Sequence, residues 1–331
     1  MKNTIDFNFQ FESYWPLDFI NCFASVMNFE GVQENQGNLY FLYDTMCGHN
    51  SLRARFDGVP TEIHRLLGDT AEDENGNDYT VDFLFGFAGY EYRKLTNPST
   101  FKNAIAESID AGKPVIAKIR PGKGIGIYRV IIGYNGDELL EPDYKDICHN
   151  KPEKSVEYGE LETLFIVGDK IKPRYTLKDG LERIRQVMEY NKNEKIWDNW
   201  LEKFTWDNFA TNNDIEDKNA RLKRVGDRMW NMSGWAFGNG LNNRIHEEPR
   251  NPEIDKLCKQ ACDSAYETFS DCFALISLAE CAECKDGNHK IFNRGEIYVL
   301  VRYAIEHMKK CEEEVLGFIK QAIGILESEG K

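Results

Sequence analysis

The chain has 331 residues, enough for two domains of ordinary size, and 41% of them are apolar. Its formal net charge of −14 at pH 7 offers no basic field to a nucleic-acid backbone or to an anionic membrane surface. The sequence shows no signal-peptide pattern and no run of the ~18 apolar residues that a membrane span needs. We therefore expect a cytoplasmic protein without nucleic-acid or membrane partners, whose nine cysteines are mostly thiols.

The stretch from Asn21 to Gly31 predicts a helix that carries Cys22. Asn21 is a good N-cap, which would place Cys22 at the first helical position. There the helix dipole and the unpaired backbone N–H groups stabilise a thiolate. If the helix begins at Pro16 instead, Cys22 lies mid-helix, and the thiol is then a small hydrophobic side chain in the core. The sequence leaves both starts open.

The remainder of the first half predicts a further helix and several strands. Asn97-Pro98 is a capping residue followed by proline, which predicts a helix that ends before Gly112. The β-like segments that follow are 114–119, 128–134, 138–141 and 163–167. Since Asn135-Gly136 is a hairpin-turn signal, segment 128–134 should pair antiparallel with segment 138–141.

Helical patterns dominate from Leu177 onward. The fold class is therefore predicted to be α+β. An N-terminal domain over residues 1–170, with a helix packed on an antiparallel sheet, precedes an all-α domain over residues 171–331. The cysteines from Cys258 to Cys284 include a CxxC pair that could chelate zinc, but their helical surroundings favour buried thiols. We therefore predict no metal site and no cofactor.

Four short motifs of the first half resemble one family when they are taken together. They are the Asn21-Cys22 helix that closes at Gly31, Gly112-Lys113-Pro114-Val115-Ile116, Val130-Ile131-Ile132-Gly133-Tyr134, and Leu139-Leu140-Glu141-Pro142-Asp143. This set resembles the papain-like fold of the bacteriocin-processing cysteine peptidases. It resembles more closely the N-terminal domain of the butirosin biosynthesis protein H family, which moves acyl groups through a cysteine thioester. The resemblance covers about residues 15–170.

The resemblance implies catalytic roles for Cys22 as the nucleophile and Asp143 as the orienting carboxylate. It places the base at Ile127 or Tyr128, and neither residue type accepts a proton near pH 7, since a tyrosine keeps its own to pH ~10. Trp15 stands about where an oxyanion-hole glutamine would be, and we expect it to contact the substrate. No pattern favours another histidine, such as His49, His64 or His149, as a replacement base.

A second candidate for substrate binding is Trp235, in a segment rich in Trp, Met and Gly over residues 229–240. This segment is either an aromatic ligand-binding loop or a bend packed by its own side chains. Two functions remain in competition. One is thiol-dependent acyl transfer or amide hydrolysis, impaired by the missing histidine. The other is a catalytically inactive papain-like module that binds a small molecule, a peptide or an acyl chain.

Overall fold

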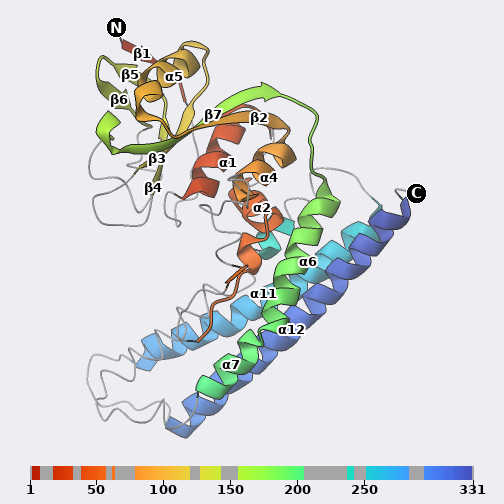
Figure 1. Cartoon of the computed structure of the whole chain (residues 1–331). Coiled ribbons are helices and arrows are strands. Elements are labelled where there is room, and N and C mark those ends of the chain that lie inside the picture. Colours follow the sequence, from red (N-terminus) through yellow and green to blue (C-terminus); the bar gives the residue numbers. More distant parts are fainter. Residues whose placement is uncertain are drawn as a thin grey trace. The chain divides into compact units, whose positions relative to one another are not determined.

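Figure 1 shows the computed structural model, which describes residues 2–7, 18–32, 39–56, 62–63, 79–119, 127–142, 156–204, 237–241, 251–282 and 294–329. The chain forms two units. Unit 1 comprises Met1–Tyr43 and Asp69–Thr176, and unit 2 comprises Asp44–Gly68 and Leu177–Lys331. The predicted boundary at 170/171 lies close to the division at Thr176/Leu177, but it places residues 44–68 in the N-terminal domain, whereas they belong to unit 2.

The larger sheet of unit 1 has four strands in the order β2-β7-β3-β4, and every neighbouring pair is antiparallel. The strands are β2 (Tyr90–Leu95), β7 (Leu161–Lys170), β3 (Val115–Ile119) and β4 (Ile127–Ile131). A short 3-10 helix, Tyr158–Glu160, precedes β7. The mixture of helices with antiparallel sheet agrees with the predicted α+β class.

A second, three-stranded sheet holds the predicted hairpin. It joins β1 (Lys2–Thr4), β5 (Gly133–Asn135) and β6 (Glu138–Leu140), with β5 and β6 antiparallel. The hairpin pairing is confirmed, but segment 128–134 is not one strand, because its first part is β4 of the other sheet. At Gly133 an added Cβ would lie 2.5 Å from the carbonyl oxygen of Asn3, so β1 approaches this position too closely for any side chain.

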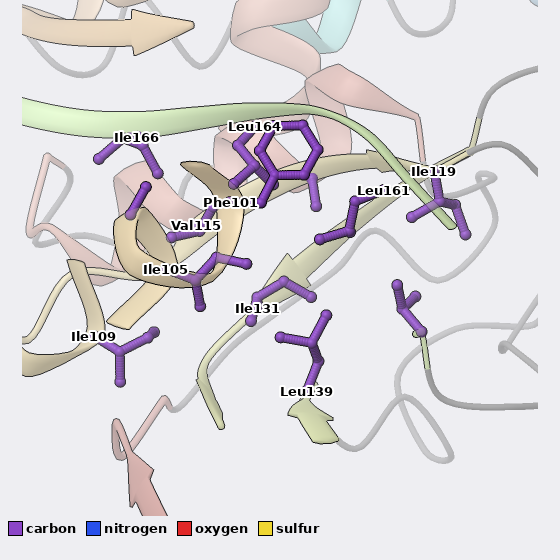
Figure 2. Close-up of a cluster of buried hydrophobic side chains, with 13 residues drawn as sticks. Phe101, Ile105, Ile109, Val115, Ile119, Ile131, Leu139, Leu161, Leu164 and Ile166 are labelled. Carbon is purple, nitrogen blue, oxygen red and sulfur yellow. The ribbon is translucent and has the colours of Figure 1, made fainter. Parts of the chain in front are cut away.

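Helices cover both faces of the four-stranded sheet. On one face lies α5 (Pro98–Asp110), which Asn97 caps by accepting a hydrogen bond from the Ser99 N–H, as the sequence predicts. Figure 2 shows the apolar cluster between α5 and the strands, where Phe101 and Ile105 meet side chains of β3 and β7. The core of this face is therefore made by alternate strand residues.

The opposite face of the sheet carries α1 (Phe19–Phe29), which packs against β3 and β4. The Cys22 helix lies on an antiparallel sheet, as predicted, but this is the four-stranded sheet and not the sheet of the predicted hairpin. Helix α4 (Tyr79–Ala88) lies beside α1, with the Phe85 ring 4.9 Å from that of Phe23. The division of the chain between the two units falls within the sequence of α2 (Leu39–Met46).

Unit 2 is built from helices. They are α6 (Leu177–Asn193), α7 (Ile196–Lys203), α11 (Pro252–Ala282) and α12 (Arg294–Glu329). The two longest, α11 and α12, run antiparallel and pack along their lengths (Figure 1). A buried cluster of α7 and α12 side chains, centred on Trp200 and Ile305, makes one part of the core. None of the helices that the structure describes is long and apolar enough to cross a membrane.

Residues 51–56 belong to unit 2 because their backbone is bound to its helices. The first of them, Ser51, ends a short 3-10 helix, His49–Ser51. The Trp200 indole N–H donates to the Ala54 carbonyl at 3.0 Å, and the Asn191 amide donates to the Ser51 carbonyl at 2.7 Å. The buried Arg53 also forms an ion pair with Glu312 of α12. A segment distant in sequence thereby completes the core of the helical unit.

Candidate functional site

The start of α1 differs from both predicted starts. Asp18 is the N-cap, and its carboxylate accepts a hydrogen bond of 2.7 Å from the Asn21 N–H. Helix α1 begins at Phe19, so Cys22 is its fourth residue, and the Cys22 N–H donates to the Asp18 carbonyl at 3.2 Å. The backbone N–H groups that would stabilise a thiolate are thus partly engaged by Asp18. The dipole effect also weakens beyond the first turn.

Cys22 is fully buried, with 0% of its surface exposed. It is not part of a disulfide. Every residue of α1 from Phe19 to Met27 is buried as well. An acyl carbonyl cannot reach this sulfur without a local opening of the structure, because its packed surroundings exclude other atoms. This burial of the Cys22 side chain agrees with the alternative in which Cys22 is a small side chain packed in the core.

Tyr128 occupies the predicted base position on the face of the sheet that α1 covers. Its side chain is 1% exposed, and its ring centroid lies 5.5 Å from that of Phe19, edge to face. Phe165 of β7 completes the group at 5.1 Å from Phe19 and 6.5 Å from Tyr128. An aromatic cluster, defined here as Phe19, Tyr128 and Phe165, therefore fills the space beneath the first turn of α1.

The structure describes little of the other predicted site residues. Ile127 pairs with Ile119 in the β3–β4 ladder, but its side chain lies outside the described part of the structure. Asp143, Trp15 and Trp235 also lie outside the described residues. The structure thus brings Cys22 and Tyr128 to one face of the sheet and does not describe the orienting carboxylate.

No histidine lies among the described residues of unit 1. The two described histidines, His49 and His307, both belong to unit 2, and His64 and His149 lie outside the described ranges. The His49 ring contacts the Asp44 carboxylate at 2.7 Å. The described part of unit 1 therefore offers no imidazole base.

The predicted buried thiols of the helical domain are confirmed where the structure describes them. Cys258 and Cys262 on α11 are 2% and 0% exposed, and neither is in a disulfide. The Cys262 thiol donates to the Gly238 carbonyl at 3.1 Å. The side chains of Cys272 and Cys281, and the whole of Cys284, lie outside the described part.

Comparison with known proteins adds no family. No protein-family model, no curated protein and no solved structure matches this chain.

A cluster that the sequence reasoning missed lies between α11 and α12. We call Glu267, Asp271, His307 and Cys311 the α11–α12 cluster. The His307 Nδ1 lies 2.6 Å from an Asp271 oxygen, and its Nε2 lies 3.7 Å from the Cys311 sulfur and 3.3 Å from Glu267 Oε2. The sequence signal was the spacing His307-x3-Cys311 on an amphipathic helix, which places both side chains on one face.

The order Cys311–His307–Asp271 resembles a nucleophile, a base and an orienting carboxylate. Burial, followed by the charges of Glu267, Glu314 and Asp271, raises the pKa of Cys311 to about 12. Burial also raises the pKa of Asp271, although the His307 hydrogen bond opposes this shift. Without a bound cation, the Cys311 thiol therefore stays protonated near neutral pH, and the cluster is not an activated nucleophile. Its anionic surroundings instead suit a cation, and a coordinated metal ion deprotonates such a thiol.

Proposed function

We propose that unit 1 is a catalytically inactive papain-like module, related to the butirosin protein H type, that binds a small molecule, a peptide or an acyl chain. The observation that carries this proposal is the aromatic cluster. Tyr128 stands where the base is expected, and its ring packs edge to face on Phe19 of the Cys22 helix. The ligand classes follow from the substrates that such a fold would accept.

Thiol-dependent acyl transfer has three requirements. The sulfur must reach the acyl carbonyl, a base must take its proton, and an acid must protonate the leaving group. Cys22 is 0% exposed, and the described part of unit 1 has no histidine beside it. The described part of unit 1 therefore lacks both a reachable sulfur and an imidazole that could act as base or acid, which supports binding without chemistry over impaired catalysis.

A thioester assay tests the proposal. The full-length protein is incubated with the octanoyl thioester of N-acetylcysteamine, and both thiol release and acylation of the Cys22 peptide are followed. We expect no acyl adduct on Cys22, and equal thiol release from wild type and Cys22→Ala. Cys47→Ala is the matched control, since Cys47 is also a buried thiol at 0% exposure. A burst of thiol that disappears only in Cys22→Ala would show that unit 1 is an enzyme.

Binding is measured separately with a ligand that cannot react. The octanoyl amide of N-acetylethylenediamine, in which nitrogen replaces the thioester sulfur, should raise the Tm of the full-length protein if unit 1 accepts an acyl chain. A ligand at a hundred times its Kd stabilises the folded state by about 2.7 kcal/mol. Cys22→Ala should show the same shift, because the sulfur takes no part in binding. An unchanged Tm at the highest soluble concentration of this amide would exclude the acyl chain as the ligand.

A further inference from the structure

We propose that Glu267, His307 and Cys311 form a three-ligand site for a divalent transition metal, and that Zn²⁺ is the ion that fits best. The three donor atoms form a triangle. Nε2 of His307 lies 3.3 Å from Oε2 of Glu267 and 3.7 Å from Sγ of Cys311, and Sγ lies 3.9 Å from Oε2. All three come from facing turns of α11 and α12 in unit 2.

This triangle matches the geometry of a tetrahedral zinc ion. With Zn–N of ~2.05 Å, Zn–S of ~2.3 Å and Zn–O of ~2.1 Å, the donor atoms stand roughly 3.4 Å (N to O), 3.6 Å (N to S) and 3.6 Å (S to O) apart. The distances in the cluster are 3.3, 3.7 and 3.9 Å, respectively. A shift of a few tenths of an ångström is enough to complete the coordination. The pair of one thiolate and one imidazole favours zinc over the oxygen-seeking Mg²⁺ and Ca²⁺.

Asp271 prepares the imidazole for this role. Its carboxylate lies 2.6 Å from Nδ1 of His307. A hydrogen bond from Nδ1–H leaves the lone pair on Nε2, which faces Cys311 and Glu267. Metal-bound histidines commonly donate their other N–H to a carboxylate in this way, which fixes the ring and raises its basicity. Asp271 is 19% exposed, so this second contact is partly shielded from water.

Helix geometry holds the donors in place without a loop. Glu267 and Asp271 are four residues apart on α11, and His307 and Cys311 are four apart on α12, so each pair shares one face of its helix. The Ser264 hydroxyl donates to Glu314 of α12 at 3.2 Å, which links the two helices about one turn away from the site. Sites on rigid helices preserve their geometry better than sites on loops.

The three ligand side chains differ in solvent exposure, and the more exposed side of the site leaves the fourth coordination position accessible. Cys311 is 1% exposed at the inner side, while the His307 and Glu267 side chains are 25% and 62% exposed. Three protein ligands with one open position are typical of zinc sites that exchange a ligand, in contrast to closed four-ligand structural sites. The proposal is independent of the function assigned to unit 1, and it departs from the prediction of no metal.

Cobalt and zinc titrations of the full chain test the site. The protein is purified without affinity-tag nickel, stripped with chelator under reducing conditions and titrated with Co²⁺. We expect one equivalent to produce a thiolate-to-cobalt charge-transfer band together with the visible bands of tetrahedral cobalt, and one equivalent of Zn²⁺ to abolish both. Absence of the thiolate band, with the helical circular dichroism intact, would overturn the proposal.

Variants assign the ligands. Cys311→Ser should abolish the charge-transfer band, and His307→Gln, at a more exposed position, should weaken Zn²⁺ binding at least 100-fold. Asp271→Asn should weaken it about 10- to 100-fold, as expected for a carboxylate behind a ligand histidine. Cys262→Ala, another buried thiol of unit 2, is the control and should leave Kd unchanged. Equal Zn²⁺ affinity in wild type, Cys311→Ser and His307→Gln would contradict the assignment.

Discussion

The buried ion pair between Arg53 and Glu312 gives the sharpest stability prediction. The two side chains are 3% and 12% exposed, and the close contact between Nε and Oε1 is an ion pair without hydrogen-bond alignment. Arg53 also donates to the carbonyls of Asn50 and Leu52, both at 2.9 Å, and Trp197 Nε1 donates to Glu312 at 2.5 Å. Glu312→Gln keeps the size of the side chain but leaves the guanidinium without its counter-charge.

The expected loss follows from the burial of the remaining charge. Removing one partner of a buried ion pair costs about 3–5 kcal/mol, because the other charge stays desolvated. We expect about 3 kcal/mol for Glu312→Gln, since the amide oxygen still accepts the Trp197 N–H. The matched control is Glu194→Gln. Its partner Arg55 is 44% exposed and Glu194 itself 35% exposed, so this change should cost about 0–1 kcal/mol.

Urea unfolding followed by tryptophan fluorescence measures both variants. Of the six tryptophans, all but Trp15 belong to unit 2, so the signal reports mainly on the unit that holds both pairs. The m-value should stay unchanged, since neither substitution alters the area exposed on unfolding. If the two variants lose the same free energy within about 0.5 kcal/mol, the Arg53–Glu312 pair is not electrostatically buried, and the account of how residues 51–56 join unit 2 is wrong.

Two further predictions concern packing and pH. Tyr128→His should destabilise unit 1 by about 2–4 kcal/mol in urea unfolding followed by far-UV circular dichroism, since it removes a fully packed ring and buries an imidazole; a loss as small as that of Tyr128→Phe would contradict the packing role. Lys320 donates to Glu189 and holds the pKa of that carboxyl below its ordinary value, so Glu189 contributes stability above about pH 4.5 that is lost as pH falls through its folded pKa. Glu189→Gln should therefore be slightly less stable than wild type at pH 7, and this difference should shrink as pH falls below 4.5. A difference that does not change with pH would refute the assignment.

Local signals in the sequence predicted several elements correctly because neighbouring residues decide them. Asn97-Pro98 fixes the start of α5 through a side-chain hydrogen bond and a preset φ. The predicted start of α1 was wrong. Asp18 is as good a capping residue as Asn21, so the local pattern does not decide between them. Phe19, the first residue of the helix, packs against Tyr128 and Phe165, and these contacts between distant residues are not visible in the local pattern.

The remaining differences also depend on contacts between distant residues. Residues 51–56 join unit 2 through α6, α7 and α12, more than a hundred residues later, and no local pattern indicates this. The sequence indicates only part of the α11–α12 cluster. The His307-x3-Cys311 spacing can be recognised, but the position of Glu267 depends on the register of two packed helices. The predicted roles of Trp15, Asp143 and Trp235 stay predictions, since these residues lie outside the described part.

The central claim is that Cys22 is a structural thiol. Native-state alkylation by iodoacetamide, with the Cys22 peptide quantified by mass spectrometry between pH 6 and 9, tests it most directly. Because Cys22 is 0% exposed, its modification requires local opening, which we expect to slow the reaction at least about 100-fold relative to the urea-unfolded chain. Cys47, also 0% exposed, should show comparable protection. Rapid alkylation of Cys22 in the native protein at pH 6, with Cys47 still protected, would reveal an accessible thiolate and contradict the account.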